Sequence, residues 1–166
     1  MKGEWQRMID YCQEHLEKIH CPVTPSYDTV LHLAVISKTE QPLKVLLEIM
    51  KGRSLPEAFL KRKNKFGNTA LHEATIYGNY EAVMLLVERC ADLLKEKNKY
   101  GETPLFTAAG FAETGIVEFI IRSKPEQCVD DNGRLLPIHI KRSEDDLSIL
   151  SAAIIGRKFG NNFSLY

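Results

Sequence analysis

The sequence repeats itself at an interval of 34 residues, and this repeat restricts the fold more than any other feature. The segment from Asn64 reads NKFGNTALHEATIYGNYEAVMLLVE, and the segment from Asn98 reads NKYGETPLFTAAGFAETGIVEFIIR. A related segment, SYDTVLHLAVISKTEQPLKVLLE, precedes them from Ser26, and a weaker copy follows around Gly133. One repeat of this length cannot bury an apolar face alone, so such repeats stack into an array with a continuous core.

Each copy has the same order of residues: a glycine turn, a T-x-L-H stretch that opens a short helix, small residues, a polar break and a second apolar helix. One equivalent position always holds a small side chain, which allows neighbouring helices to approach closely: Ala34, Ala74 and Ala108. Apolar residues recur at helical spacing in the second helices: Leu43, Val83 and Val117, then Leu46, Leu86 and Ile120. The pattern predicts an all-α solenoid of helix-turn-helix repeats joined by short hairpin loops.

These residues resemble the ankyrin repeat, whose pattern is roughly G-x-T-P-L-H-x-A-A followed by G-x-x-x-x-V-x-x-L-L. The resemblance covers about 26–155 and is strongest at Gly67, Thr69, Leu71, His72, Ala74, Gly78, Gly101, Thr103, Pro104, Leu105, Ala108 and Ala109. It implies a scaffold that binds other proteins. Residues 3–5 and 28–35 are also similar to plant ankyrin proteins with a C-terminal membrane domain of the PGG type, which these residues do not include. That similarity implies a role in plant defence or stress signalling.

The predicted boundaries divide the chain into one ankyrin-repeat domain, 1–155, and a flexible tail, 156–166. Within the domain we expect a helical cap at 3–20 and about four repeats, near 26–50, 64–89, 98–122 and 130–155. Trp5 would cover the edge of the core from the cap helix. In the fourth repeat Lys141 and Arg142 replace the small pair, and a charged side chain packs poorly in a core. We therefore expect a divergent last repeat, in a fragment, a short isoform or a diverged paralogue.

Composition excludes several classes of protein. Lysine plus arginine and aspartate plus glutamate number 22 each, so no overall charge favours nucleic acid, and we expect no nucleic-acid partner. No apolar stretch of the chain is long enough to span a bilayer, and the start lacks a secretory signal. We expect a cytoplasmic protein, either free or at the cytosolic face of a membrane. The spacing of the cysteines fits neither a metal knuckle nor a disulfide framework, which predicts free thiols: Cys12, Cys21, Cys90 and Cys128.

The residues that carry chemistry in enzymes have a simpler interpretation here. Three histidines stand where the repeat places one, and in the family this ring bonds the adjoining turn: His32, His72 and His139. His15 and His20 lie near Cys21 without the four spaced ligands of a zinc site, so we expect them to be exposed. Adjacent aspartates at 130–131 and 145–146 are typical of turns. We therefore predict no catalytic residue, no metal and no cofactor, and a chain that is not an enzyme.

A local excess of positive charge lies near two successive turns. Six basic residues fall between 51 and 65 against the single acid Glu57, and three more lysines precede the next turn. Aromatic residues occupy equivalent positions just before the turn glycines: Phe66 precedes Gly67, and Tyr100 precedes Gly101. We predict that the hairpin tips and the groove of the inner helices bind a protein segment through Lys65, Phe66, Asn68, Tyr77, Lys99, Tyr100, Glu102 and Phe111. The alternatives are an ordinary solvated basic surface and, for Tyr77 and Phe111, packing between repeats.

The sequence is compatible with more than one class of partner. A protein or peptide partner is favoured, an acidic one if the basic hairpins form its binding surface. One alternative is a membrane-proximal regulatory module whose basic hairpins contact anionic lipid. Another is a regulatory subunit of an enzyme. Exposed end faces of the array would also favour a homo-oligomer.

Overall fold

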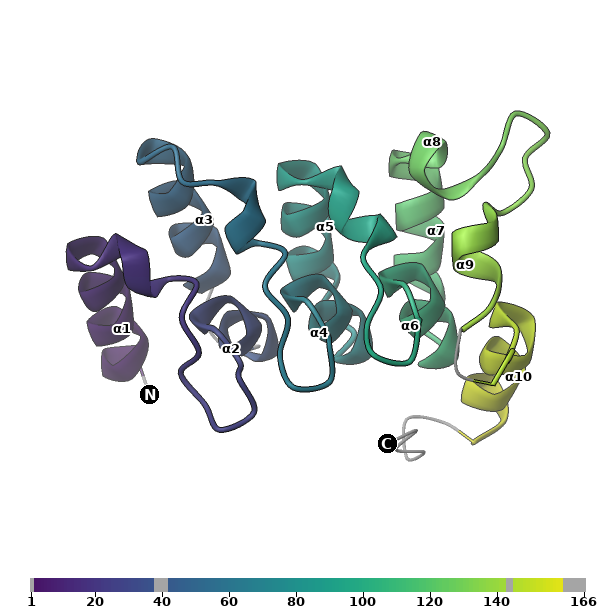
Figure 1. Cartoon of the computed structure of the whole chain (residues 1–166), viewed down its shortest axis with the longest axis horizontal. Helices are drawn as coiled ribbons and strands as arrows, with labels where there is room; N and C mark the ends of the chain where they lie inside the picture. Colours follow the sequence, from purple (N-terminus) through teal and green to yellow (C-terminus); the bar gives the residue numbers. More distant parts are fainter. Residues whose placement is uncertain (1, 38–41, 143–144, 160–166) are drawn as a thin grey trace.

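The helices lie in two rows along an elongated array (Figure 1), in a computed structural model that describes residues 2–37, 42–142 and 145–159. The inner row holds α2 (Val30–Ile36), α4 (Ala70–Ile76), α6 (Pro104–Gly110) and α10 (Ile149–Phe159). The outer row holds α1 (Lys2–Glu14), α3 (Pro42–Gly52), α5 (Tyr80–Arg89) and α7 (Thr114–Ser123). The predicted all-α solenoid is confirmed.

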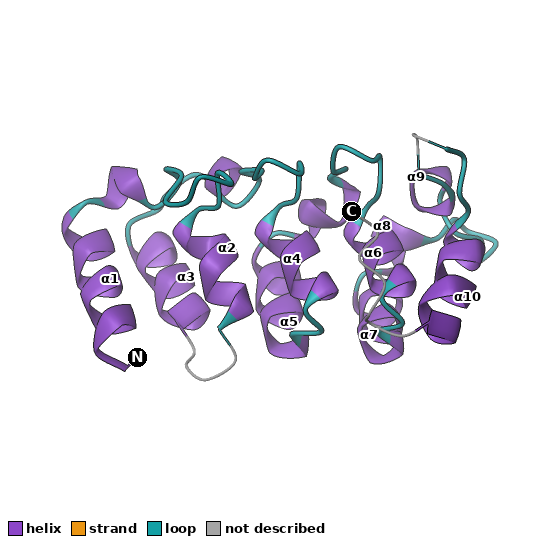
Figure 2. Ribbon diagram, turned by 90° about the horizontal axis from the view of Figure 1, so that it is seen from below, coloured by secondary structure: helices purple, strands orange, loops and turns teal. Residues whose placement is uncertain are grey.

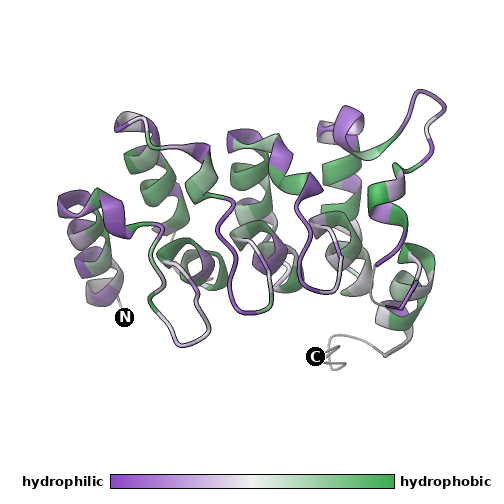
Figure 3. Cartoon of the chain, viewed as in Figure 1, coloured by the Kyte–Doolittle hydropathy of each residue, from purple (hydrophilic) through white to green (hydrophobic). Residues whose placement is uncertain are grey.

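Short helical segments connect the rows. They are η1 (Leu16–Lys18), η2 (Glu57–Phe59), η3 (Ala91–Lys95), α8 (Pro125–Cys128) and α9 (Pro137–Ile140). Seen from below, the loops that enter the inner helices project along one side of the array (Figure 2). These hairpins are largely hydrophilic, whereas apolar residues concentrate in the helices (Figure 3).

Helices α2 and α4 begin after a threonine because this residue and the following histidine satisfy the first turn, whereas α6 follows Thr103 with Phe106 in the place of the histidine. The Thr29 backbone N–H donates to His32 Nδ1 at 3.1 Å, and Thr69 donates to His72 Nδ1 at 3.2 Å. Since Nδ1 accepts a hydrogen bond, we assign the proton to Nε2. His72 Nε2 then donates to the carbonyl oxygen of Glu102 at 3.0 Å. Each histidine therefore closes its own turn and reaches the next repeat, as the sequence predicts for these two positions.

Close packing of the rows depends on the small residue at the equivalent position of each inner helix. Ala74 and Ala108 are completely buried, and Ala34 is 2% exposed. Leu86 and Ile120 of the outer row are also completely buried. Fully burying a side chain of this size stabilises a fold by about 1.5–3 kcal/mol. These apolar faces form one continuous core that runs through the repeats.

The N-terminal cap is shorter than the sequence suggests. We predicted one helix over 3–20, but α1 ends at Glu14 because His15 leaves the helical region, with φ −126° and ψ 68°. Helix α1 packs against α3, in the position of an outer helix without an inner partner. Trp5 is partly buried against the core, which agrees with its expected place at the core edge.

The fourth repeat, at 130–155, departs from the helix pair of the other repeats, which agrees with the predicted divergence. Helix α9 has only four residues, and α10 packs against α6 in the inner row (Figure 2). Ser148 Oγ accepts the N–H of Ser151 at 3.1 Å, so it caps α10 much as a threonine caps the other inner helices. A Cβ at Gly156 would collide with the carbonyl oxygen of Gly110, so glycine is what allows this approach. The predicted start of a flexible tail at 156 is wrong, because α10 continues to Phe159, and 160–166 lie outside the described residues.

Candidate functional site

The hairpins are built on a repeated turn in which one amide side chain accepts two backbone N–H groups. Asn64 Oδ1 accepts from Phe66 and Asn68, and Asn98 Oδ1 accepts from Tyr100 and Glu102, all at 3.0–3.1 Å. An oxygen that binds both N–H groups fixes the loop against the start of the helix. The two hairpins therefore present equivalent residues in the same conformation.

Neighbouring hairpins are also joined by main-chain hydrogen bonds. Lys65 N–H donates to the carbonyl of Ser26 at 2.7 Å, and Lys99 N–H donates to the carbonyl of Phe66 at 3.0 Å. Gly67 makes the second contact possible, because it has φ 77° and a Cβ there would lie 2.5 Å from Lys99 N. The tips of the first three hairpins therefore form one continuous surface that is fixed by the backbone.

Behind the tips, buried side chains form a polar ladder between the repeats. Asn64 Nδ2 donates to Asp28 Oδ1 at 2.9 Å and to Glu73 Oε1 at 2.8 Å. Asn68 Nδ2 donates to the same Glu73 oxygen at 2.9 Å, and Asn98 Nδ2 donates to Asn68 Oδ1 at 3.1 Å. A buried polar group is costly without partners, and these bonds supply partners both within the repeat, through Glu73, and from the adjacent repeats, through Asp28 and Asn98.

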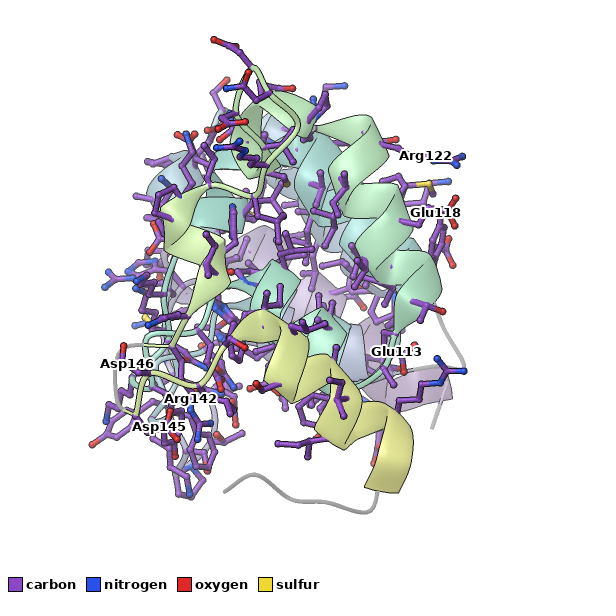
Figure 4. All side chains as sticks on the ribbon, turned by 90° about the vertical axis from the view of Figure 1, so that its right-hand side faces the viewer. Glu113, Glu118, Arg122, Arg142, Asp145 and Asp146 are labelled. Atoms are coloured by element: carbon purple, nitrogen blue, oxygen red, sulfur yellow. The ribbon has the colours of Figure 1, made fainter. Side chains whose placement is uncertain are left out.

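The ladder continues into the fourth repeat through a charged residue. Asn98 Nδ2 donates to Glu102 Oε2 at 2.9 Å, and Arg142 Nη1 donates to Glu102 Oε1 at 3.2 Å. Arg142 also makes two hydrogen bonds of 2.6 Å to Asp145, which lies beside it in Figure 4. These bonds raise the pKa of Arg142 and lower the pKa of Asp145 to about 2. The arginine that we expected to disturb packing is instead paired at the end of the ladder.

Two of the predicted binding residues belong to this ladder and do not reach the surface. Asn68 is 2% exposed and Glu102 is 4% exposed, and both side chains are fully used within the fold. The prediction that they lie on the hairpin tips is wrong. The reason is that both follow the left-handed glycine of the turn, where the chain has already turned back toward the helix.

The other tip residues are brought together as predicted. Lys65 and Lys99 are exposed, whereas Phe66 and Tyr100 are half-buried between them. Lys65 Nζ lies 4.9 Å from the centroid of the Phe66 ring. Tyr27 is a residue that the sequence did not suggest for binding: it is 60% exposed at the tip of the first hairpin. Its signal was available, because it occupies the left-handed position of the glycines, with φ 63°.

We call the set Tyr27, Lys65, Phe66, Lys99 and Tyr100 the finger surface. The positive charge around this surface is smaller than the run of basic residues in the sequence suggests, because two neighbouring lysines are paired with an acid. Lys63 Nζ lies 2.9 Å from Glu96 Oε2, and Lys61 Nζ lies 3.7 Å from Glu96 Oε1. Within the described part of the chain, Lys65 and Lys99 have no ion-pair partner.

The two groove residues occupy equivalent positions with different surroundings. Tyr77 follows α4 and is 43% exposed, whereas Phe111 follows α6 and is half-buried. Burial raises the pKa of Tyr77, with further contributions from Glu73 and Asp28, so the phenol stays protonated and can donate a hydrogen bond. Tyr77 is therefore the more accessible of the two side chains.

The remaining histidines and cysteines have local roles. His15 is exposed as predicted, but His20 is not, because its ring stacks on Phe59 with centroids 4.2 Å apart. All four cysteines are free, as predicted. Among the residues the structure describes, no group of His, Cys, Asp and Glu side chains is placed to hold a metal ion. Similarly, no helix in the described ranges is both long and apolar enough to cross a membrane.

Comparison with known proteins decides the family. The family model described as ankyrin repeats, in three copies, matches residues 6–95 and 31–132, which together span most of the array. The chain belongs to the ankyrin-repeat family. Ankyrin repeats are generally protein-protein interaction modules and typically serve as non-catalytic scaffolds. A search of curated proteins finds no match for the chain.

Proposed function

We propose that this ankyrin protein binds an acidic protein segment across the finger surface, with Tyr77 as an additional contact in the groove. The observation that supports this most strongly is the joining of three hairpins by main-chain hydrogen bonds, which places basic and aromatic side chains side by side. Aromatic anchors with charged neighbours are the usual centres of binding energy at protein interfaces.

Preorganisation supports the same function. The turns at Asn64 and Asn98 are fixed by side-chain hydrogen bonds, and the ladder holds both turns against the inner helices. A surface that is ordered before binding loses little conformational entropy when the partner arrives. Affinity can therefore come from a few side chains, and sequence differences at the tips can change specificity without changing the fold.

Charge supports an acidic partner. Lys65 and Lys99 occupy equivalent positions on adjacent hairpins, so an extended segment with spaced carboxylates would meet both ammonium groups. Such contacts mainly accelerate association and weaken with added salt. A protonated Tyr77 phenol, at the C-terminal end of α4, adds a neutral donor in the groove.

The resemblance to plant ankyrin proteins supports two narrower proposals. A role in plant defence, or a place at the cytosolic face of a membrane, depends only on the resemblance of residues 3–5 and 28–35 to plant ankyrin proteins. Anionic lipid would use the same lysines, but the pairing of Lys61 and Lys63 with Glu96 reduces the charge available to a membrane surface. Regulation of an enzyme would be one outcome of binding a protein segment.

The test is a selection of random displayed peptides against the immobilised chain. We expect enriched peptides with an excess of Asp and Glu, and we expect their binding to be lost in the variant Lys65→Glu/Lys99→Glu. The control variant Lys44→Glu/Lys51→Glu makes the same charge change at exposed positions of α3 and should bind normally. Phe66→Ala should weaken binding by about tenfold or more.

Two outcomes would contradict the proposal. Enriched peptides without an excess of acids would remove the charge argument, and equal losses in both lysine variants would show a nonspecific charge effect. A parallel sedimentation with vesicles, with and without acidic lipid, covers the membrane alternative. Vesicle binding that depends on Lys65 and Lys99, without any enriched acidic peptide, would favour lipid over protein.

A further inference from the structure

The C-terminal end of the array carries an apolar face on α10. Leu150 is 69% exposed and Ile154 is 58% exposed, and residues four apart lie on one side of a helix. The opposite side of α10 holds Ala152 and Gly156, which are buried against α6. Figure 4 looks onto this end of the array, with α10 in front. Ile140 of α9, a short helix in contact with α10, is also 38% exposed.

Exposed aliphatic residues that lie next to one another mark places where another molecule binds. In a repeat array, the next unit normally packs on this side of an inner helix. Since α10 stands in the row of inner helices, its outward side is the stacking surface of the array.

We propose that this face binds the same face of a second copy of the chain, with the two α10 helices antiparallel. Charges at the two ends of the helix favour this occupant. Arg157 is exposed in the C-terminal half of α10, and Asp146, whose side chain is 86% exposed, precedes its N-terminus. Figure 4 places Asp145 and Asp146 at the N-terminal side of the helix. The face is therefore apolar in the middle, basic at one end and acidic at the other.

A twofold axis gives this arrangement a definite register. If the axis passes midway between Leu150 and Ile154, each Leu150 lies on Ile154 of the second copy. The same operation brings Arg157 to the position beside Leu147 of the second copy, next to Asp146. Among the described residues, Asp146 is paired with Lys141 Nζ at 3.6 Å, and because its side chain is 86% exposed it can also accept the new ion pair.

The size of the face predicts weak association. Stable interfaces bury about 800 Å² on each partner, and a face centred on three aliphatic side chains is much smaller. We therefore expect a dissociation constant of about 0.01–1 mM, and sedimentation of the full chain should show a monomer-dimer equilibrium across that concentration range. Ile154→Glu should abolish the dimer. Val45→Glu, at an exposed position of α3, is the matched control and should leave the equilibrium unchanged.

A charge swap tests the register independently of apolar burial. Arg157→Asp and Asp146→Lys should each weaken self-association by about tenfold, because each places like charges together across the axis. An equal mixture of the two variants should associate again, since both pairs in the mixed dimer are then attractive. Circular dichroism verifies that each variant is folded.

Three results would overturn the proposal. A wild-type chain that stays monomeric at the highest concentration has no such face-to-face contact. Dimerisation that persists in the Ile154→Glu variant places the contact elsewhere. If the single charge variants associate weakly and their mixture associates no better, the antiparallel register is wrong.

Discussion

Burial of His72 should make the stability of the protein depend on pH. Its pKa is lowered from 6.5 to about 3, mainly because burial disfavours the charged ring, whose Nε2 is committed to the Glu102 carbonyl. Between these two pKa values the unfolded chain binds more protons than the folded chain, so stability is lost as the pH falls. Lowering the pH from 7.5 to 5 should therefore remove about 2 kcal/mol through this residue.

The assay is urea unfolding followed by circular dichroism at several pH values between 7.5 and 5. The variant His72→Gln should be less stable at pH 7.5 by about 1–3 kcal/mol, because the Glu102 carbonyl and the Thr69 N–H lose a buried partner. Its stability should then fall less steeply with pH than that of the wild type. His15→Gln, at an exposed position, should keep the wild-type dependence.

The decisive quantity is the change in the free energy of unfolding between pH 7.5 and 5, because each variant is then compared with its own stability at pH 7.5. If His72→Gln loses as much free energy of unfolding between pH 7.5 and 5 as the wild type, the ring is not held neutral in the fold. The assigned Nε2 proton and the contact to the next repeat would then be wrong.

Three further predictions concern the turns, the ladder and the thiols. Gly67→Ala should destabilise the fold by about 1–2 kcal/mol or more in thermal unfolding, because the φ of Gly67 is 77° and the added Cβ would meet Lys99. Gly52→Ala, in open space at the end of α3, should be nearly neutral. Asn98→Ala should cost about 1–3 kcal/mol in urea unfolding, since it removes a turn and a rung together. A thiol reagent at pH 8 should react first with the partly exposed Cys21, and Cys21→Ser should remove the fast phase, because burial raises the pKa of Cys128 to about 11.

The sequence predicts the repeated part of this structure well because each repeat meets the same physical constraints. Glycine at 67 and 101 marks the left-handed turns, and alanine at 74 and 108 marks the close helix contacts. Few residue types are tolerated at these positions, so the residue that is present indicates the local backbone conformation or packing. The ankyrin resemblance adds the histidine role, which the hydrogen bonds of His72 confirm.

Features that depend on contacts between distant residues were not predictable in the same way. Nothing local to Glu102 distinguishes an exposed tip acid from a ladder residue, because its burial depends on Asn98 and on Arg142 of the next repeat. The place of α10 depends on a close approach between Gly110 and Gly156, which lie far apart in sequence. Tyr27 was missed for a different reason. The repeat register shows a tyrosine where the other repeats have glycine, and a nonglycine residue in a left-handed turn also implies an exposed ring.

The central claim is that the finger surface binds an acidic protein segment, and mapping that contact on the isotope-labelled full chain by NMR tests it most directly. Titration with an acidic peptide from the display selection should shift the amide signals of Lys65, Phe66, Lys99 and Tyr100 most, with smaller changes around Tyr77. The outer helices α3, α5 and α7 should be unaffected. Shifts concentrated on those outer helices, with the hairpin signals unchanged, would contradict the claim.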